Sequence, residues 1–216
     1  MSAGTYLIGI AGPSGAGKTC LATNLATALQ AKVLGLDCYY RDLSQLARAE
    51  RDRMNFDAPQ ALEDELLIEQ VTQLLQGRAV KLPVYDFAHH IRSQESVLLE
   101  PVEVLIIEGL FTLYWPRLRE LLGTAVYVDL HDELCLARRT DRDVRERGRT
   151  PESVLQQYAA TVAPMAQRYV RPTIANADVI VSGTDPIQQG VTRVLSHYAR
   201  GVALGERHHV IRASRF

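Results

Sequence analysis

The sequence predicts an α/β fold, with a mainly parallel sheet between two layers of helices. Two observations lead to this prediction. Short apolar segments typical of buried strands alternate with longer segments that have helical periodicity. The first strand also leads directly into a glycine-rich loop and then a helix, the order found in phosphate-binding βα units. The expected architecture is therefore a three-layer α/β/α domain.

The composition is consistent with one such domain over residues 1–200. The chain has 216 residues, of which 47% are hydrophobic and 23% charged, enough for a full core. A formal net charge of −1 argues against an extended nucleic-acid-binding surface, and no apolar segment approaches the roughly 18 residues of a membrane span. The three cysteines are scattered and no signal peptide precedes the first strand, so we expect no disulfide framework, no zinc site and a cytoplasmic location.

A phosphate-binding loop lies between the first strand, expected over 6–11, and the first helix, expected over 20–29. Residues 12–19 read GPSGAGKT and match the pattern GxxxxGK[S/T]. In such loops, backbone N–H groups and the lysine surround nucleotide phosphates, and the next hydroxyl holds Mg²⁺. A glycine-rich turn without a ligand is the less favoured alternative. The predicted nucleotide-binding residues are Gly12, Ser14, Gly15, Ala16, Gly17, Lys18, Thr19 and Cys20.

Two carboxylates follow predicted strands. Asp37 comes after the second strand (31–36), and Glu108 comes after a strand over 102–107. Because ligands of open α/β sheets bind beyond the carboxyl ends of the strands, we expect both side chains to face the phosphate loop. Asp37 is the candidate to deprotonate an acceptor hydroxyl, and Glu108 the candidate to organise Mg²⁺. Capping of a turn is the alternative for Asp37.

The other elements follow in order. Residues 41–60 form a polar, irregular connection, and strands over 79–87 and 96–100 predict a β-hairpin arm inserted over about 79–100. The histidines between these strands could be surface residues or part of a small-molecule pocket. Helices are expected over 61–76, 113–122, from 133, over 151–169 with a disturbance at Pro164, and over 187–200; strands over 125–130 and 177–181; and residues 201–216 have no assignment.

An arginine-rich segment begins at about residue 138. Arg139 and Arg142 lie on one helical face, and Gly148 would let the segment bend. A solvated, salt-bridged helix is the usual interpretation of such a charge pattern. Arginine, however, suits bidentate contacts with a triphosphate, so we expect a lid over about 138–163 that excludes water and favours transfer over hydrolysis. The absence of an NKxD motif argues against a GTPase.

Several motifs over about residues 6–190 together resemble the uridine–cytidine kinases, within the phosphoribulokinase and uridine kinase family. The resemblance implies a P-loop kinase fold and ATP-dependent phosphorylation of the ribose 5′-hydroxyl of uridine or cytidine. It also implies a homo-oligomer, commonly a tetramer. Beside the phosphate loop, the matching residues are Asp37-Cys38-Tyr39-Tyr40, Asn55-Phe56-Asp57, Pro83-Val84-Tyr85-Asp86-Phe87 with His90 and Arg92, Ile107-Glu108-Gly109, the segment from Arg138 to Arg149, Gln157-Tyr158 and Ala177-Asp178-Val179-Ile180.

The resemblance also implies individual roles. Asp37 would be the catalytic base, acting with Lys18 and Arg142. Thr19 and Glu108 would hold Mg²⁺. The nucleoside would be bound by Asp37, Tyr40, Asp57, Tyr85, Phe87, His90, Arg139 and Gln157, and ATP by the loop together with Arg142, Arg147, Arg149 and, near the adenine, Asp185.

The chain departs from the family pattern after Asp57. The family usually continues His-Pro-Asp-Ala-Phe-Asp, whereas residues 58–63 read Ala-Pro-Gln-Ala-Leu-Glu, and Cys38 stands where serine is common. These departures concern substrate identity more than phosphoryl transfer. Two alternatives therefore stay open: a related kinase acting on a sugar phosphate or a pantothenate-like alcohol, and a nucleotide-binding regulator without transfer activity.

Overall fold

A computed structural model describes residues 4–203 and contains a five-stranded main sheet in the order β2-β5-β1-β6-β7. All four strand pairings are parallel. The predicted mainly parallel sheet is thereby confirmed. The strands are β2 (Lys32–Gly35), β5 (Val104–Glu108), β1 (Tyr6–Ala11), β6 (Thr124–Asp129) and β7 (Val179–Ser182).

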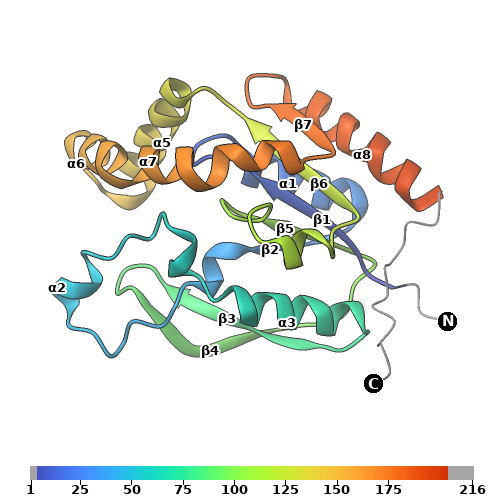
Figure 1. The fold of residues 1–216 in the computed structure, drawn as a ribbon, viewed down its shortest axis with the longest axis horizontal. Helices are drawn as coiled ribbons and strands as arrows, with labels where there is room; N and C mark the ends of the chain where they lie inside the picture. The colour runs from blue at the N-terminus through green and yellow to red at the C-terminus, as the bar shows by residue number, and fades with distance from the viewer. Residues whose placement is uncertain (1–3, 204–216) are drawn as a thin grey trace.

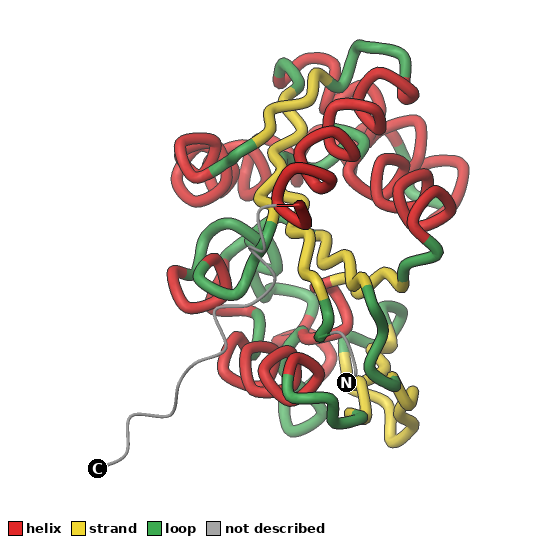
Figure 2. The backbone as a smooth tube through the Cα atoms, turned by 90° about the vertical axis from the view of Figure 1, so that its right-hand side faces the viewer, coloured by secondary structure: helices red, strands yellow, loops and turns green. Residues whose placement is uncertain are grey.

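Helices cover both faces of this sheet, as Figures 1 and 2 show. Successive residues of β1 point to opposite faces, so Ile8 and Ile10 pack in one apolar cluster and Leu7 in the other. The first cluster includes side chains of α1 (Lys18–Leu29) and α8 (Ile187–Ala203), and the second includes those of α3 (Asp64–Leu75). The chain therefore forms the three layers that the sequence predicts.

The hairpin arm is present over the predicted residues, but its second strand is longer than predicted. Strands β3 (Val80–Asp86) and β4 (Ile91–Leu99) pair antiparallel as a separate two-stranded sheet. The prediction that the second strand begins at residue 96 was wrong, because β4 is largely exposed and its first half carries polar side chains that hide a strand signal. The Asp86 carboxylate accepts hydrogen bonds from the backbone N–H groups of Ala88 and His89. These bonds close a short turn directly after β3, so the second strand begins at Ile91 and not at residue 96.

Three segments also differ from the prediction in their helical content. The helix expected over 113–122 is only α4 (Pro116–Arg119), which starts at a proline. The connection at 41–60 contains the short helix α2 (Arg48–Arg51) and a 3₁₀ turn at Pro59–Ala61. Helix α8 continues to Ala203, so residues 201–203 are helical, whereas the unassigned residues 204–216 lie outside the described part of the chain.

The arginine-rich segment lies on one long helix. Helix α5 (Asp132–Arg147) ends at Gly148, whose φ of 61° reverses the chain as an αL cap. The next helical region consists of α6 (Pro151–Gln157), α7 (Ala163–Met165) and two π-helical turns on either side of α7. These wider turns border Pro164, which agrees with the predicted disturbance there.

No helix within residues 4–203 has the length and apolar character needed to cross a membrane.

Candidate active site

The phosphate loop joins β1 to α1 in a conformation that needs glycine at two tightly packed positions. Gly12 and Gly15 have φ values of 145° and 85°. A Cβ atom at Gly12 would lie 2.4 Å from the carbonyl oxygen of Val128, and one at Gly15 would lie 2.4 Å from that of Cys135. The loop is therefore pressed against the end of β6 and the start of α5, and α1 begins directly after it with its unpaired N–H groups.

Lys18, Asp37 and Glu108 share the edge of the sheet beyond this loop. Gly35 of β2 lies beside Glu108 of β5 in the parallel register, and Asp37 follows two residues later in a 3₁₀ turn. Burial lowers the pKa of Lys18, while the charges of Glu108 and Asp37 act to raise it. The predicted convergence of the two strand-end carboxylates on the loop lysine is thus present.

The Asp37 side chain is exposed to solvent, although the surrounding protein atoms lie close enough to desolvate its carboxylate in part. Partial burial raises its pKa, and the positive charges of Lys18, Arg147 and Arg142 oppose that shift. Within residues 4–203 its side chain makes no hydrogen bond, so it does not cap the turn in which it lies. A solvent-accessible carboxylate among cations can accept a proton from a bound hydroxyl group.

Thr19 and Glu108 form a pair suited to Mg²⁺. The Thr19 hydroxyl donates a hydrogen bond to Glu108 Oε1 at 3.1 Å, and burial raises the pKa of Glu108 while Lys18 lowers it. A hydroxyl and one carboxylate match the oxygen ligands that Mg²⁺ takes from proteins when phosphates and water complete its shell. Across residues 4–203 no three His, Cys, Asp or Glu side chains cluster as a self-contained metal site.

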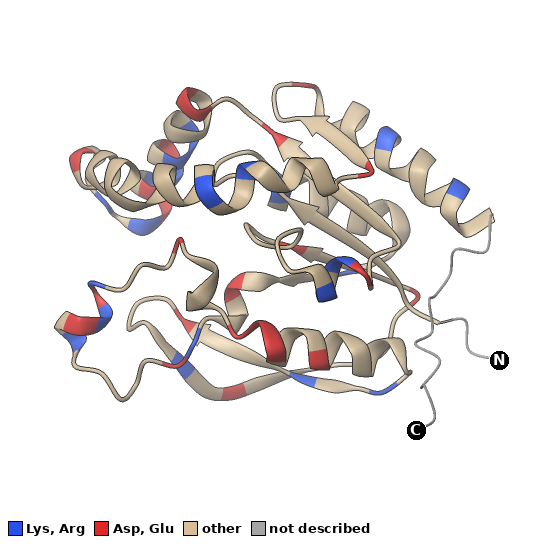
Figure 3. Ribbon diagram, in the orientation of Figure 1, with Lys and Arg blue, Asp and Glu red and all other residues tan. Residues whose placement is uncertain are grey.

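Acidic and basic residues are mixed along α5 and the turn after it (Figure 3). Arg139 is buried, and it donates to the Ser14 hydroxyl at 2.9 Å and to Gln157 Oε1 at 3.1 Å. Arg149 also donates to Gln157 Oε1. The segment is therefore a salt-bridged helix that also contacts the phosphate loop. A salt-bridged helix and a phosphate-binding segment are thus compatible interpretations of the same residues.

An aromatic cluster lies between the 41–60 connection and the hairpin arm. The ring of Tyr40 is 5.3 Å from that of Tyr85, and Phe87 is 5.2 Å from Tyr85. His90 stacks on Phe56 with ring centroids 4.5 Å apart and an interplanar angle of 21°. Burial lowers the pKa of His90, which favours a neutral ring able to donate and accept hydrogen bonds. Phe56 was not among the predicted site residues, although it lies within a quoted motif.

Asp57 lies near the lid helices. Its carboxylate accepts a hydrogen bond from the Thr161 hydroxyl at 2.9 Å, and its charge acts to raise the pKa of Arg139. Thr161 lies in the π-helical turn after α6, where its hydroxyl also donates to the backbone oxygen of Gln157. Asp57, Arg139 and Gln157 are thus brought to one place, whereas Thr161 was missed because no local motif marks it.

The predicted adenine residue, Asp185, lies in the turn after β7, exposed to solvent. This turn packs on the phosphate loop, because a Cβ atom at Gly183 would be 2.6 Å from the carbonyl oxygen of Ala16. Arg138 donates to the carbonyl oxygen of Gly183 at 2.9 Å and so links α5 to the same turn. The turn therefore lies beside the phosphate loop, and the role of Asp185 stays a prediction. Arg138 lies within a quoted motif but was not among the predicted site residues.

A cavity of about 240 Å³ lies beside the aromatic cluster rather than at the phosphate loop. It includes Ala58 and Gln60, two of the positions where the chain departs from the family pattern, and it shares Phe56 with the cluster. The departures therefore shape the surface next to the hairpin arm. The complete lining is Arg41, Leu43, Met54, Asn55, Phe56, Ala58, Gln60 and Ala61.

Comparisons with known proteins identify a family and a fold for this chain. The model of the phosphoribulokinase / uridine kinase family matches residues 7–187. A uridine kinase of Vibrio atlanticus is 43% identical over 182 residues, and one of Lactobacillus johnsonii is 42% identical over 179; each alignment covers 81% of this chain and 85% of the relative. The solved phosphoribulokinase from Rhodobacter spheroides superposes with a TM-score of 0.64 over 86% of this chain and 75% of that one, at 15% identity, which is a likeness of fold alone.

Proposed function

The chain belongs to the phosphoribulokinase / uridine kinase family, and we propose that it transfers the terminal phosphate of ATP to the 5′-hydroxyl of uridine or cytidine. The observation that carries the proposal is the placement of Asp37 just beyond β2, beside the end of β5, where its charge acts on Lys18 at the end of the phosphate loop. A base beside the phosphate-binding lysine is what a kinase needs and a passive nucleotide-binding protein does not. The uridine kinase relatives disfavour both alternatives.

In this proposal the loop and lid hold the triphosphate. Backbone N–H groups at the start of α1 and the Lys18 ammonium bind phosphate oxygens, and Arg142, Arg147 and Arg149 approach from the lid. Mg²⁺ would be held by Thr19 and Glu108, and it would neutralise charge on the phosphates. Because the transition state of phosphoryl transfer spreads negative charge over oxygens, these fixed positive groups stabilise it.

Asp37 acts on the acceptor. Its carboxylate accepts the proton of the 5′-hydroxyl as that oxygen attacks the terminal phosphorus, and the bond to the bridging oxygen of ADP breaks. Asp57, Arg139 and Gln157 orient the ribose, since an ionised carboxylate can accept hydrogen bonds from both ribose hydroxyls. The reacting oxygen is thereby held in line with the phosphate.

The aromatic cluster binds the pyrimidine. Tyr40, Tyr85 and Phe87 offer ring faces and edges, and the neutral His90 can hydrogen-bond the exocyclic group at position 4 of the base. A neutral imidazole serves as donor or acceptor according to its tautomer, so this site accepts both uridine and cytidine. The cytoplasmic location and the homo-oligomer, commonly a tetramer in similar kinases, stay predictions.

A coupled assay of ADP release with Mg-ATP tests the proposal. The acceptors are uridine, cytidine, adenosine, ribulose 5-phosphate and pantothenate, with a control that lacks an acceptor. We expect turnover with uridine and cytidine alone. ADP release only with another acceptor would keep the kinase chemistry and reject the pyrimidine pocket, and ATP binding without any release would favour a regulator.

A further inference from the structure

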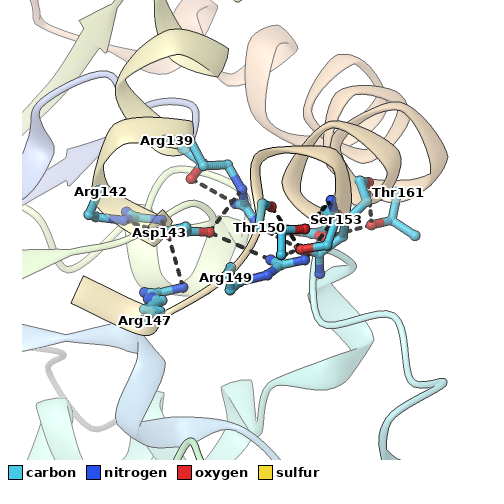
Figure 4. Close-up of polar contacts among 11 residues, drawn as sticks. Arg139, Arg142, Asp143, Arg147, Arg149, Thr150, Ser153 and Thr161 are labelled. Atoms are coloured by element: carbon cyan, nitrogen blue, oxygen red, sulfur yellow. Dashed lines mark hydrogen bonds and ion pairs between the residues drawn. The ribbon is translucent and has the colours of Figure 1, made fainter. Parts of the chain in front are cut away.

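We propose that Asp143, which has no assigned role, is a positioning residue that holds four arginines of the predicted lid in one arrangement, three of them directed to the triphosphate and Arg139 placed between the phosphate loop and the ribose site. The inference rests on the proposed function for the identity of the ligand, a nucleoside triphosphate. Figure 4 shows the carboxylate of Asp143 surrounded by guanidinium groups from α5 and from the turn after it. These four residues, here called the arginine quartet, are Arg139, Arg142, Arg147 and Arg149.

The Asp143 side chain is fully buried, with no exposed surface. Arg142 donates to its Oδ1 from Nε at 2.9 Å and from Nη2 at 2.7 Å. The other members of the quartet are more distant, each with a nitrogen 3.6 Å from a carboxylate oxygen of Asp143. Charged side chains are seldom fully buried unless they are paired, so this carboxylate is held in place by the cations around it.

The charge balance explains why such a carboxylate is needed. Four guanidinium groups within a few ångströms of one another repel, and arginine does not lose its proton at neutral pH. Asp143 and Asp57, the second carboxylate that acts on Arg139, do not neutralise four cations, so the quartet keeps a net positive charge while its members stay together. That combination, an assembled but still cationic cluster, suits a triphosphate.

Two polar atoms at the centre of the cluster lack hydrogen bonds. Asp143 Oδ2 and Arg139 Nε are both buried and make no hydrogen bond within the described residues, and they form an ion pair at 3.6 Å. A buried group without a hydrogen bond is costly, and a small inward movement of the quartet would bring these two atoms to hydrogen-bond distance. Closure of the arginines around a bound phosphate therefore improves the contacts of Asp143 rather than breaking them.

The backbone of Asp143 also fixes the direction in which the quartet points. Its carbonyl oxygen accepts hydrogen bonds from the backbone N–H groups of Gly148 and of Arg149, the latter at 3.2 Å. This one residue therefore anchors both sides of the turn at Gly148. Arg147 before the turn and Arg149 after it are thereby directed to the same carboxylate.

The quartet reaches both halves of the active site. Arg139 contacts the phosphate loop through the Ser14 hydroxyl at 2.9 Å. Arg142 and Arg147 lie near enough to Asp37 to act on its ionisation. Loss of the Asp143 charge is thus expected to disturb triphosphate binding and turnover together, although Asp143 itself touches neither substrate.

The test compares Asp143→Asn with a matched control, Asp141→Asn. Asp141 lies on the same helix, but its side chain is 73% exposed and it pairs with Arg145, which is outside the quartet. Dissociation constants for Mg-ATP and Mg-ADP are measured by titration calorimetry, together with kcat and KM for uridine phosphorylation and the melting temperature. We expect Asp143→Asn to weaken ATP binding about tenfold and ADP binding less, because a charge-assisted contact contributes a factor of this order. Asp141→Asn should match the wild type.

The ratio of ATP to ADP affinity, compared between Asp143→Asn and the wild type, distinguishes a positioning role of Asp143 from a purely structural one. General destabilisation would lower the melting temperature and leave this ratio unchanged, which would overturn the proposal. Tighter ATP binding by Asp143→Asn would also overturn it, because the carboxylate would then be a competitor of the phosphates. Nucleotide binding is measured directly, so the two proposals can fail separately. A wild type that does not phosphorylate uridine would reject the proposed function. A lower ratio of ATP to ADP affinity in Asp143→Asn would still support the positioning role of Asp143.

If Asp143→Asn does not fold, the wild type itself provides the measurement. Hydrogen exchange at arginine Nε–H groups is followed by NMR with and without the non-hydrolysable analogue of Mg-ATP. We expect the Nε–H of Arg139 to become protected when the analogue binds, because its partner is the unpaired oxygen of Asp143. Unchanged exchange at Arg139 would contradict the proposal.

Discussion

Asp37 is the residue on which the proposed chemistry depends. Its carboxylate is accessible, has no hydrogen-bond partner within residues 4–203, and lies among the charges of Lys18, Arg142 and Arg147. Replacement by asparagine keeps the size of the side chain and removes the base. We therefore expect Asp37→Asn to bind Mg-ATP nearly as well as the wild type and to lose a factor of about 10² to 10⁴ in kcat. Calorimetry and steady-state kinetics measure the two effects, and near-normal turnover would exclude Asp37 as the base.

The pH dependence of kcat follows from the raised pKa of Asp37. A raised pKa means that the base becomes protonated at a higher pH than an ordinary aspartate, so activity falls earlier on acidification. The positive charge of Arg147 opposes this rise. We therefore expect Arg147→Met to raise the pKa of Asp37 further and to move the acid limb of kcat to higher pH.

Arg145→Met is the matched control for that profile. Arg145 lies on the same helix and is 67% exposed, and its ion pairs are with Asp141 and Glu146. Its replacement should leave the acid limb where it is in the wild type. An acid limb that moves equally in both variants, or in neither, would contradict the influence of Arg147 on Asp37.

Single residues were predictable from sequence where a local pattern constrains them. The phosphate loop, Asp37 and Glu108 belong to strand ends or to a short motif, and the structure brings them together. Phe56, Thr161 and the importance of Asp143 were not predicted, because each depends on contacts that no short pattern reports. Thr161, for example, meets Asp57 across 104 positions of sequence.

At the level of elements, the hairpin arm is attached to the 41–60 connection by two arginines of α2. Arg48 donates to the backbone oxygen of Ala88 at 2.8 Å, and Arg51 to that of His89 at 2.6 Å. These contacts hold the tip of the arm and, through it, His90 against Phe56. The arm is therefore positioned by a short helix that the sequence analysis treated as an irregular connection.

Loosening this attachment should affect the nucleoside more than the nucleotide. We expect the double variant Arg48→Met and Arg51→Met to raise the KM for uridine about threefold to tenfold, since exposed polar contacts are each worth up to roughly 1 kcal/mol. The dissociation constant of Mg-ATP should stay unchanged, because the phosphate loop is on another element.

Arg53→Met provides the control for the double variant. Arg53 lies next to α2, is exposed, and makes no polar side-chain contact within the described residues. Its replacement should leave both constants unchanged. An unaltered KM for uridine in the double variant would show that the arm does not need this attachment.

Elements were predicted well where apolar periodicity is strong. Strands β1, β5 and β6 are almost entirely buried, and the sequence located all three within two residues. The exposed strand β4 was placed too late and too short, because a two-stranded arm with an open face carries many polar residues. The length of helix α4 was overestimated. The apolar side chains of this region are buried in the core, but most of them belong to an irregular segment and not to a helix.

At the level of the whole molecule, the candidate site gathers parts from the full length of the chain. The loop after β1, the ends of β2 and β5, the tip of the hairpin arm and α5 lie on the same side of the molecule, beyond the carboxyl ends of the strands (Figure 1). Parallel strands place their carboxyl ends on the same side, so the fold itself assembles the loop and the two carboxylates. The side chains of the hairpin arm and of the arginine-rich segment lie on exposed elements, where the sequence predicts the kinds of residue better than their geometry.

The central claim, transfer of phosphate to the 5′-hydroxyl of a pyrimidine ribonucleoside, is tested most directly by ³¹P NMR of the product made from uridine and Mg-ATP. Phosphorylation at the 5′ position couples the phosphorus to two protons and gives a triplet, whereas the 2′ and 3′ products give doublets. We predict that the product gives a triplet and co-elutes in chromatography with uridine 5′-monophosphate. We also predict that 5′-deoxyuridine, which lacks the 5′-hydroxyl, gives no product. A doublet, or equal turnover of 5′-deoxyuridine, would contradict the proposed placement of the ribose against Asp37.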